Sequence, residues 1–106
     1  MTGANPHRGE VAVTLDGRRH VARLTLGALA ALEAELGEDS LIGVIGRFES
    51  GRFSSRDVIA VLVAGLRGGG WQGEAPDLMV VEVEGGPVTA ARVAAELIAR
   101  AFHGQT

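Results

Sequence analysis

Apolar and polar residues alternate near the start of the chain, and the alternation is interrupted once, at Asp16-Gly17. Val11, Val13 and Leu15 alternate with other residues before this point, and Val21 continues the period afterwards. Asp-Gly between alternating segments is typical of a hairpin turn, because both central residues of a type I′ turn need positive φ. We predict strands at about 10–15 and 18–24. A two-stranded hairpin is marginal alone, so we expect its apolar face to lie on helices.

The pattern then changes to a helical period. Four leucines fall on one predicted helical face, which Thr25 would cap and Gly37 would end: Leu26, Leu29, Leu32 and Leu36. A second helix is predicted at about 41–51, opened by Asp39 or Ser40, with a short apolar stripe. Gly43 and Gly46 weaken this helix by about 1 kcal/mol each relative to alanine.

The third predicted helix carries the clearest start signal. Ser54 and Asp57 resemble a capping box in which Asp replaces the usual Glu. The helix should run to about Leu66, and its centre, 58-VIAVLVAGL-66, is apolar on every side. Such a helix is either buried all round or faces a partner.

Residues 76–84 are ambiguous. Val80, Val81 and Val83 favour a strand by residue type, whereas Pro76 at a first helical position favours a helix. We predict a short helix, and the strand remains the alternative. The last helix is predicted at 88–102, with a broad apolar stripe.

These elements predict an α+β fold, in which an N-terminal two-stranded antiparallel β-hairpin packs on a bundle of four to five short helices. The length of 106 residues predicts one domain. We assign residues 1–8 to a disordered N-terminus, 9–103 to the single domain and 104–106 to a loose tail.

Composition narrows the class of function. The chain has no cysteine, which excludes disulfides, thiolate metal sites and cysteine nucleophiles. The net charge of −3 argues against nucleic acid as the main partner. No apolar run reaches the roughly 18 residues that span a bilayer, and the N-terminus lacks the apolar core of a signal peptide. We therefore expect a soluble cytoplasmic protein that does not bind membranes.

One glycine-rich segment has the spacing of a dinucleotide-binding loop. Gly68, Gly70 and Gly73 fit G-x-G-x-x-G, but in that fold the glycines follow a strand and begin a helix. Here they follow a predicted helix, and no lysine is present for a phosphate loop. We interpret them as a helix end and a flexible bend, with Trp71 folding back as an apolar plug.

No set of reactive side chains converges in the sequence. His7, His20 and His103 share no ligand spacing, and the pairs Glu33/Glu35 and Glu82/Glu84 have no apparent basic or metal-binding partner. We expect no catalytic, cofactor-binding or metal-binding residue, and therefore no enzyme.

Two adjacent helices joined by a short glycine-containing turn also invite comparison with DNA-binding proteins. Arg47, Arg52 and Arg56 cluster near this joint. A recognition helix must offer a polar face to the groove, but 58–63 is apolar. We expect surface arginines in salt bridges, and a small DNA-binding regulator is the least favoured alternative.

Three segments resemble one family: 5-NPHRGEVAVTLDGRRHVARLTLGALAALE-33, 54-SSRDVIAVLVAGLRGGG-70 and 84-EGGPVTAARVAAELIARAF-102. They are similar to the small tail proteins of gene transfer agents, phage-like particles of alphaproteobacteria, which are grouped with phage tail assembly chaperones. The resemblance implies a non-enzymatic chaperone that binds the tape-measure protein, or other tail proteins, during tail morphogenesis. Because the family also carries tail-tube labels, a structural subunit of the mature tail is the alternative. Self-association is left open.

An apolar helical client needs an apolar groove to shield it. We place the candidate partner-binding groove on the second and third predicted helices, with these residues: Leu41, Ile45, Phe48, Val58, Val61 and Leu62. The alternative is that these residues are simply core.

Overall fold

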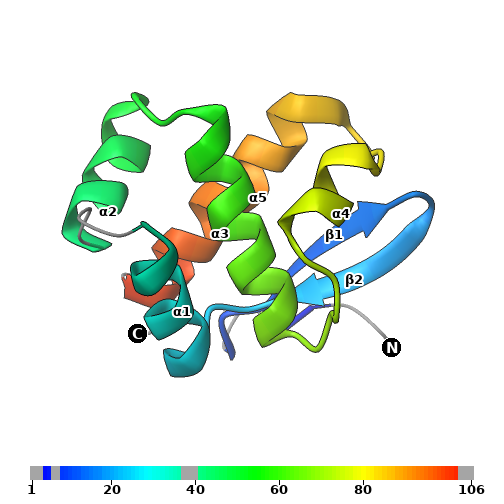
Figure 1. Ribbon diagram of the computed structural model, residues 1–106, viewed down its shortest axis with the longest axis horizontal. Helices are drawn as coiled ribbons and strands as arrows, with labels where there is room; N and C mark the ends of the chain where they lie inside the picture. The colour runs from blue at the N-terminus through cyan, green and yellow to red at the C-terminus, as the bar shows by residue number, and fades with distance from the viewer. Residues whose placement is uncertain (1–3, 6–7, 37–40, 103–106) are drawn as a thin grey trace.

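The residues that the structure describes form a β-hairpin followed by five helices, as the sequence predicts (Figure 1). The computed structural model describes residues 4–5, 8–36 and 41–102. The elements in chain order are β1 (Val11–Leu15), β2 (Arg18–Ala22), α1 (Leu26–Leu36), α2 (Leu41–Ser50), α3 (Ser55–Gly68), α4 (Ala75–Val80) and α5 (Gly86–Phe102). The α+β class is confirmed. The predicted roles of Gly37, Asp39, Ser40, His7 and His103, and the predicted tail at 104–106, fall outside the described residues.

The hairpin has the register that the Asp-Gly turn predicts. Leu15 pairs with Arg18 across the turn, and Val11 pairs with Ala22 at the far end. Asp16 and Gly17 have φ of 50° and 80°, the left-handed conformation that a type I′ turn requires. One face of the hairpin is apolar and buried, through Val11, Val13, Leu15 and Ala22. This face packs on α3 and α5, which supply the support that an isolated hairpin lacks.

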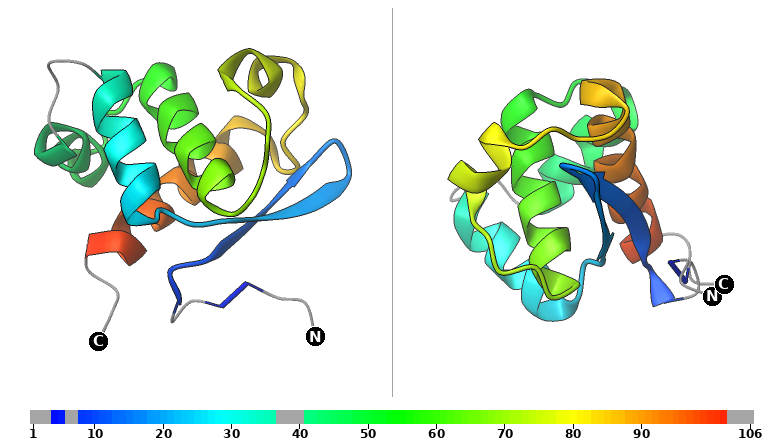
Figure 2. Two further views of the ribbon diagram at one scale, coloured as in Figure 1. Left: turned by 60° about the horizontal axis from the view of Figure 1, so that its bottom comes forward. Right: turned by 90° about the vertical axis from the view of Figure 1, so that its right-hand side faces the viewer.

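Helix α3 is the centre of the molecule. It contacts α1, α5 and β2, and Figures 1 and 2 show it lying between α1 and α5. Within it Val61 and Leu66 are fully buried, and the remaining apolar residues of 58–66 are buried or half-buried. Burial explains the apolar side that carries Val61, Leu62 and Leu66, whereas Ile59, Ala60 and Val63 on the other side are only half-buried.

Glycines let the end of α3 lie directly on the backbone of β2. A side chain at Gly68 would collide with the carbonyl oxygen of Arg23, and one at Gly69 with that of Val21. The Arg23 N–H also donates to the Gly65 carbonyl at 2.8 Å. These glycines therefore serve close packing, which the prediction of a flexible bend missed.

The ambiguous segment 76–84 shows both tendencies in turn. Ala75–Val80 forms the short helix α4, with Pro76 at its start. The predicted helix does not continue, because Val83 instead forms an antiparallel bridge with Leu15 of β1. Two backbone hydrogen bonds of 2.9 Å fix this bridge, from Asp16 N–H to the Glu82 carbonyl and from Glu84 N–H to the Thr14 carbonyl. The helix predicted for residues 81–84 was therefore wrong.

One helical face and one helix boundary also differ from the prediction. Leu26 is 85% exposed, although it was placed on the inner face of α1 with Leu32. Six residues separate the two, which is about 240° of rotation, so they do not share a narrow face. Ala28 and Leu32, four residues apart, face inward instead.

Helix α5 begins at Gly86, two residues before the predicted start. No helix among the described residues has the length and apolar character to cross a membrane.

Candidate partner-binding surfaces

The six residues of the predicted groove divide into two groups. Phe48, Val61 and Leu62 are buried in the core, so their side chains are not available to a partner in this conformation. Leu41, Ile45 and Val58 are half-buried and pack against the same core. A binding surface on α2 and α3 remains a prediction, and it reduces to these three side chains and their exposed neighbours.

Helices α2 and α3 are joined by an ion pair between Arg47 and Asp57. Arg47 Nε lies 2.8 Å from Asp57 Oδ2, and Arg47 Nη2 lies 2.9 Å from Asp57 Oδ1. Such a bidentate pair fixes both distance and orientation. Asp57 also completes the predicted capping box, since it accepts from the Ser54 N–H at 3.0 Å and its own N–H donates to Ser54 Oγ at 3.1 Å.

The environment of Asp57 favours its charged form. The hydrogen bonds from Arg47 are the largest cause that holds the pKa of this carboxyl below its ordinary value of 3.8, and the Ser54 N–H adds to the effect. Burial acts in the opposite direction but does not prevail. Both carboxylate oxygens of Asp57 thus accept hydrogen bonds, and the residue serves as an ionic link between the two helices.

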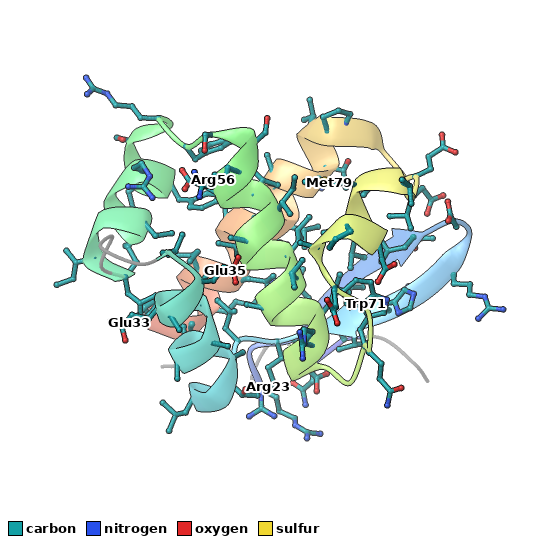
Figure 3. All side chains as sticks on the ribbon, viewed as in Figure 1. Arg23, Glu33, Glu35, Arg56, Trp71 and Met79 are labelled. Atoms are coloured by element: carbon teal, nitrogen blue, oxygen red, sulfur yellow. The ribbon has the colours of Figure 1, made fainter. Side chains whose placement is uncertain are left out.

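The arginines near this joint therefore have different roles. Arg47 is engaged with Asp57, whereas Arg52 and Arg56 are exposed. Figure 3 labels Arg56 near the start of α3. The helix that would have to enter a DNA groove, α3, packs on α1, α5 and β2, and the centre of its outer side is formed by half-buried apolar residues, which does not suit a recognition helix.

The glycine-rich segment lies between two helices, as predicted. Gly68 is the last residue of α3, and the chain reaches α4 only at Ala75, so no strand precedes the glycines. Trp71 is half-buried and packs against the core, which confirms that it folds back. A side chain at Gly73 would collide with the Trp71 ring. This arrangement is packing around a tryptophan, and it does not form a phosphate cradle.

An acidic hollow lies where residues 81–87 meet the hairpin turn. Its volume is about 580 Å³, and Asp16, Glu82 and Glu84 contribute its charge. Asp16 Oδ1 is already used, because it accepts from the Glu82 N–H at 2.9 Å. Within the described part of the chain no three His, Cys, Asp or Glu side chains are grouped as metal ligands.

The other acidic pair, Glu33 and Glu35, does not lie at this hollow. Both residues are exposed and lie on different sides of α1 (Figure 3).

Large apolar side chains reach solvent at positions that the sequence did not single out. Ile42 in the first turn of α2 is 80% exposed. Met79 and Val80 at the end of α4, and Val88 in the first turn of α5, are 67–84% exposed. Leu78 anchors α4 to the core and leaves its two successors outside. No local signal marks these residues, because whether an aliphatic residue is covered depends on tertiary neighbours.

Helix α2 carries three neighbouring aliphatic residues that are exposed or half-buried. Leu41, Ile42 and Ile45 occupy one side of its first turns, and we call them the α2 strip. Helix α2 lies at the edge of the molecule, where a further helix would meet no obstruction from the hairpin (Figure 1). The arrangement suits docking of an apolar helix.

Comparison with known proteins places this architecture in a phage-related group. A search of curated proteins and a search of solved structures each found no significant match. A model of the family described as "Phage tail tube protein, GTA-gp10" matches residues 8–104, which is nearly the whole chain. The chain therefore belongs to this family of tail proteins of gene transfer agents.

Proposed function

We propose that this chain acts by binding other tail proteins during assembly of a phage-like tail, and that it transforms no substrate. Membership of a tail protein family supports this, since such families are generally not enzymes. The observation that carries the proposal is the aliphatic surface of α2, where Ile42 is almost fully exposed beside two half-buried residues. An exposed apolar surface of this kind is typical of a protein contact.

The first candidate partner is the tape-measure protein. A long apolar helix needs cover until the tube forms around it, and the α2 strip offers side chains at positions i, i+1 and i+4 of one helix. In this role the chain is an assembly chaperone that shields its client and is then released.

Co-expression with the tape-measure protein tests this role. Ile42→Asp places a charge on the strip at a position where the fold does not need the isoleucine, and it should abolish co-purification. Val88→Asp is the matched control, because it changes an equally exposed aliphatic residue on another helix. Unchanged capture with Ile42→Asp, or equal loss with Val88→Asp, would contradict binding through the α2 strip.

A structural subunit of the tail tube is the second candidate. The printed description of the family, a tail tube protein, favours it. Mass spectrometry of purified particles separates the two roles. A subunit is present in stoichiometric amount relative to the other tail proteins, whereas a chaperone is absent from the mature particle.

A further inference from the structure

The outer side of α3 carries apolar residues with an arginine at each end. Ile59, Ala60 and Val63 are half-buried, whereas Arg56 and Arg67 are exposed. Steps of three and four residues place all five on one side of the helix, away from its fully buried residues. We call these five residues the α3 face. Arg56 and Arg67 lie about 16 Å apart along the helix axis.

Two helices flank the α3 face. Helices α1 and α4 both contact α3, and Figure 1 shows α3 in front of α5, with α1 and α4 to its two sides. Figure 3 shows Glu35 on the α1 side of α3 and Met79 on the α4 side. Glu35 is exposed, and Met79 is 67% exposed. The apolar surface of the α3 face therefore continues toward α4, and a carboxylate lies toward α1.

The charged residues of this region have no partner within the described part of the chain. Neither Arg56 nor Arg67 takes part in an ion pair or a side-chain hydrogen bond there, and the same holds for Glu35. Arg56 also stands in the first turn of α3, where the helix dipole favours an acidic side chain. The contacts within the fold therefore do not account for an arginine at this position.

We propose that the α3 face binds a helix of another protein, one that carries an apolar stripe with an acidic residue at each end. Carboxylates with the spacing of the two arginines lie on the same side of such a helix, because this spacing is close to three whole turns. They would meet Arg56 and Arg67 while the apolar residues between them cover Ile59, Ala60 and Val63. No helix in the described part of the chain has two carboxylates at this spacing, so a second copy does not supply the partner.

A nucleic acid fits this face less well than a helix does. Its phosphates would meet two arginines about 16 Å apart, with apolar side chains between them and the carboxylate of Glu35 at the side. An amphipathic acidic helix matches the apolar centre and the charged ends together. The inference goes beyond the proposed function, since it concerns a different helix and does not depend on the α2 strip.

A synthetic peptide held helical by a staple tests the proposal. It carries one leucine stripe and two glutamates at the spacing of the two arginines, and the control peptide has lysines in place of the glutamates. On titration the backbone NMR signals of Ile59, Ala60 and Val63 should shift, and the affinity should fall as the salt concentration is raised. The lysine peptide should bind at least about tenfold more weakly.

Charge reversal on the protein tests the same contact from the other side. Arg56→Glu and Arg67→Glu should each raise the Kd of the glutamate peptide about fivefold, and the double variant should prefer the lysine peptide. Arg92→Glu is the matched control, because it reverses the charge of an exposed arginine on α5, and it should leave the Kd unchanged. All three side chains are exposed, so circular dichroism should show a retained fold.

Several results would overturn this assignment. They are the absence of binding by the glutamate peptide at the highest concentration measured, equal binding of the lysine peptide, and competition by a DNA duplex for the same signals. A wild-type dimer that Arg67→Glu dissociates would assign the α3 face to a second copy instead. Loss of peptide binding with Ile42→Asp would place the peptide on the α2 strip, which would contradict this inference and leave the proposed function standing.

Failure of the tape-measure experiment would leave the peptide result unaffected, because the two tests concern different helices.

Discussion

Arg47 donates two nearly equal hydrogen bonds to the carboxylate of Asp57, and this pair fastens α2 to the first turn of α3. Asp57 is only 6% exposed, whereas the Arg47 side chain keeps about a third of its surface. The pair matters for the α2 strip as well, because it helps to set the position of α2 on the core.

Loss of Asp57 should destabilise the fold more than loss of its cap alone. Asp57→Ala removes the ion pair and the capping box together, and we expect the free energy of unfolding to fall by about 2–3 kcal/mol. This is less than the loss for a fully buried pair, because water reaches Arg47. Denaturant unfolding monitored by circular dichroism measures the change.

Two variants separate the contributions in that experiment. Ser54→Ala removes one capping hydrogen bond and should lower the free energy of unfolding by about 1 kcal/mol. Arg56→Ala, at an exposed position of the same helix, should change it by less than about 0.5 kcal/mol. If Asp57→Ala were no worse than Arg56→Ala, the clamp would contribute nothing to stability.

The clamp should also make stability depend on acid pH. Because the pKa of Asp57 is lower in the folded protein than its ordinary value of 3.8, the stabilisation is fully present above that value. It is lost as the pH falls through the lower folded-state pKa. The difference in unfolding free energy between wild type and Asp57→Asn should therefore shrink as the pH is reduced from 5 toward 2. A constant difference over this range would show that Asp57 does not titrate as the geometry implies.

The same substitution should have opposite effects at two helical glycines. Gly68→Ala introduces a methyl group against the Arg23 carbonyl and should destabilise by about 1–3 kcal/mol. Gly46→Ala meets no atom within 4 Å and should stabilise α2 by up to about 1 kcal/mol. Thermal melting of both variants checks the contrast. Equal effects would mean that α3 does not approach β2 as closely as described.

Charge substitutions should distinguish core from surface in the predicted groove. Val61→Asp buries an unpaired carboxylate at a fully buried position and should unfold the protein. Ile42→Asp should leave it folded, within about 0.5 kcal/mol, because the side chain is already exposed. The heteronuclear NMR spectrum of each variant shows whether the fold is retained. Loss of binding by Val61→Asp would follow from unfolding and would not locate a binding surface. Loss of binding by the folded variant Ile42→Asp would locate it on α2.

Local signals in the sequence were sufficient where the structure depends on neighbours in the chain. The Asp16-Gly17 turn and the Ser54–Asp57 box were both predicted, since each is decided within four residues. The extended conformation at the end of segment 76–84 was not predicted. The strand tendency of Val83 is expressed only because Leu15, far away in the chain, offers an edge to pair with.

The candidate surface was harder to predict than the fold. Periodicity identifies aliphatic residues but does not say which neighbour covers them, so Val61 and Leu62 were assigned to a groove that α1 and α5 help to fill. For the same reason the exposure of Ile42, Met79 and Val80 had no signature. The close packing at Gly68 depends on Arg23, which a one-dimensional pattern does not connect to it.

The clasp between the hairpin turn and residues 82–84 has a consequence for the newly made chain. The hairpin is made well before the residues that secure it, since Asp16 meets its partner Glu82 only after 66 further residues have been translated. Until then the hairpin has neither its clasp nor the support of α5. Strands β1 and β2 of the nascent chain therefore stay open to premature associations until residues 82–84 and α5 have been made.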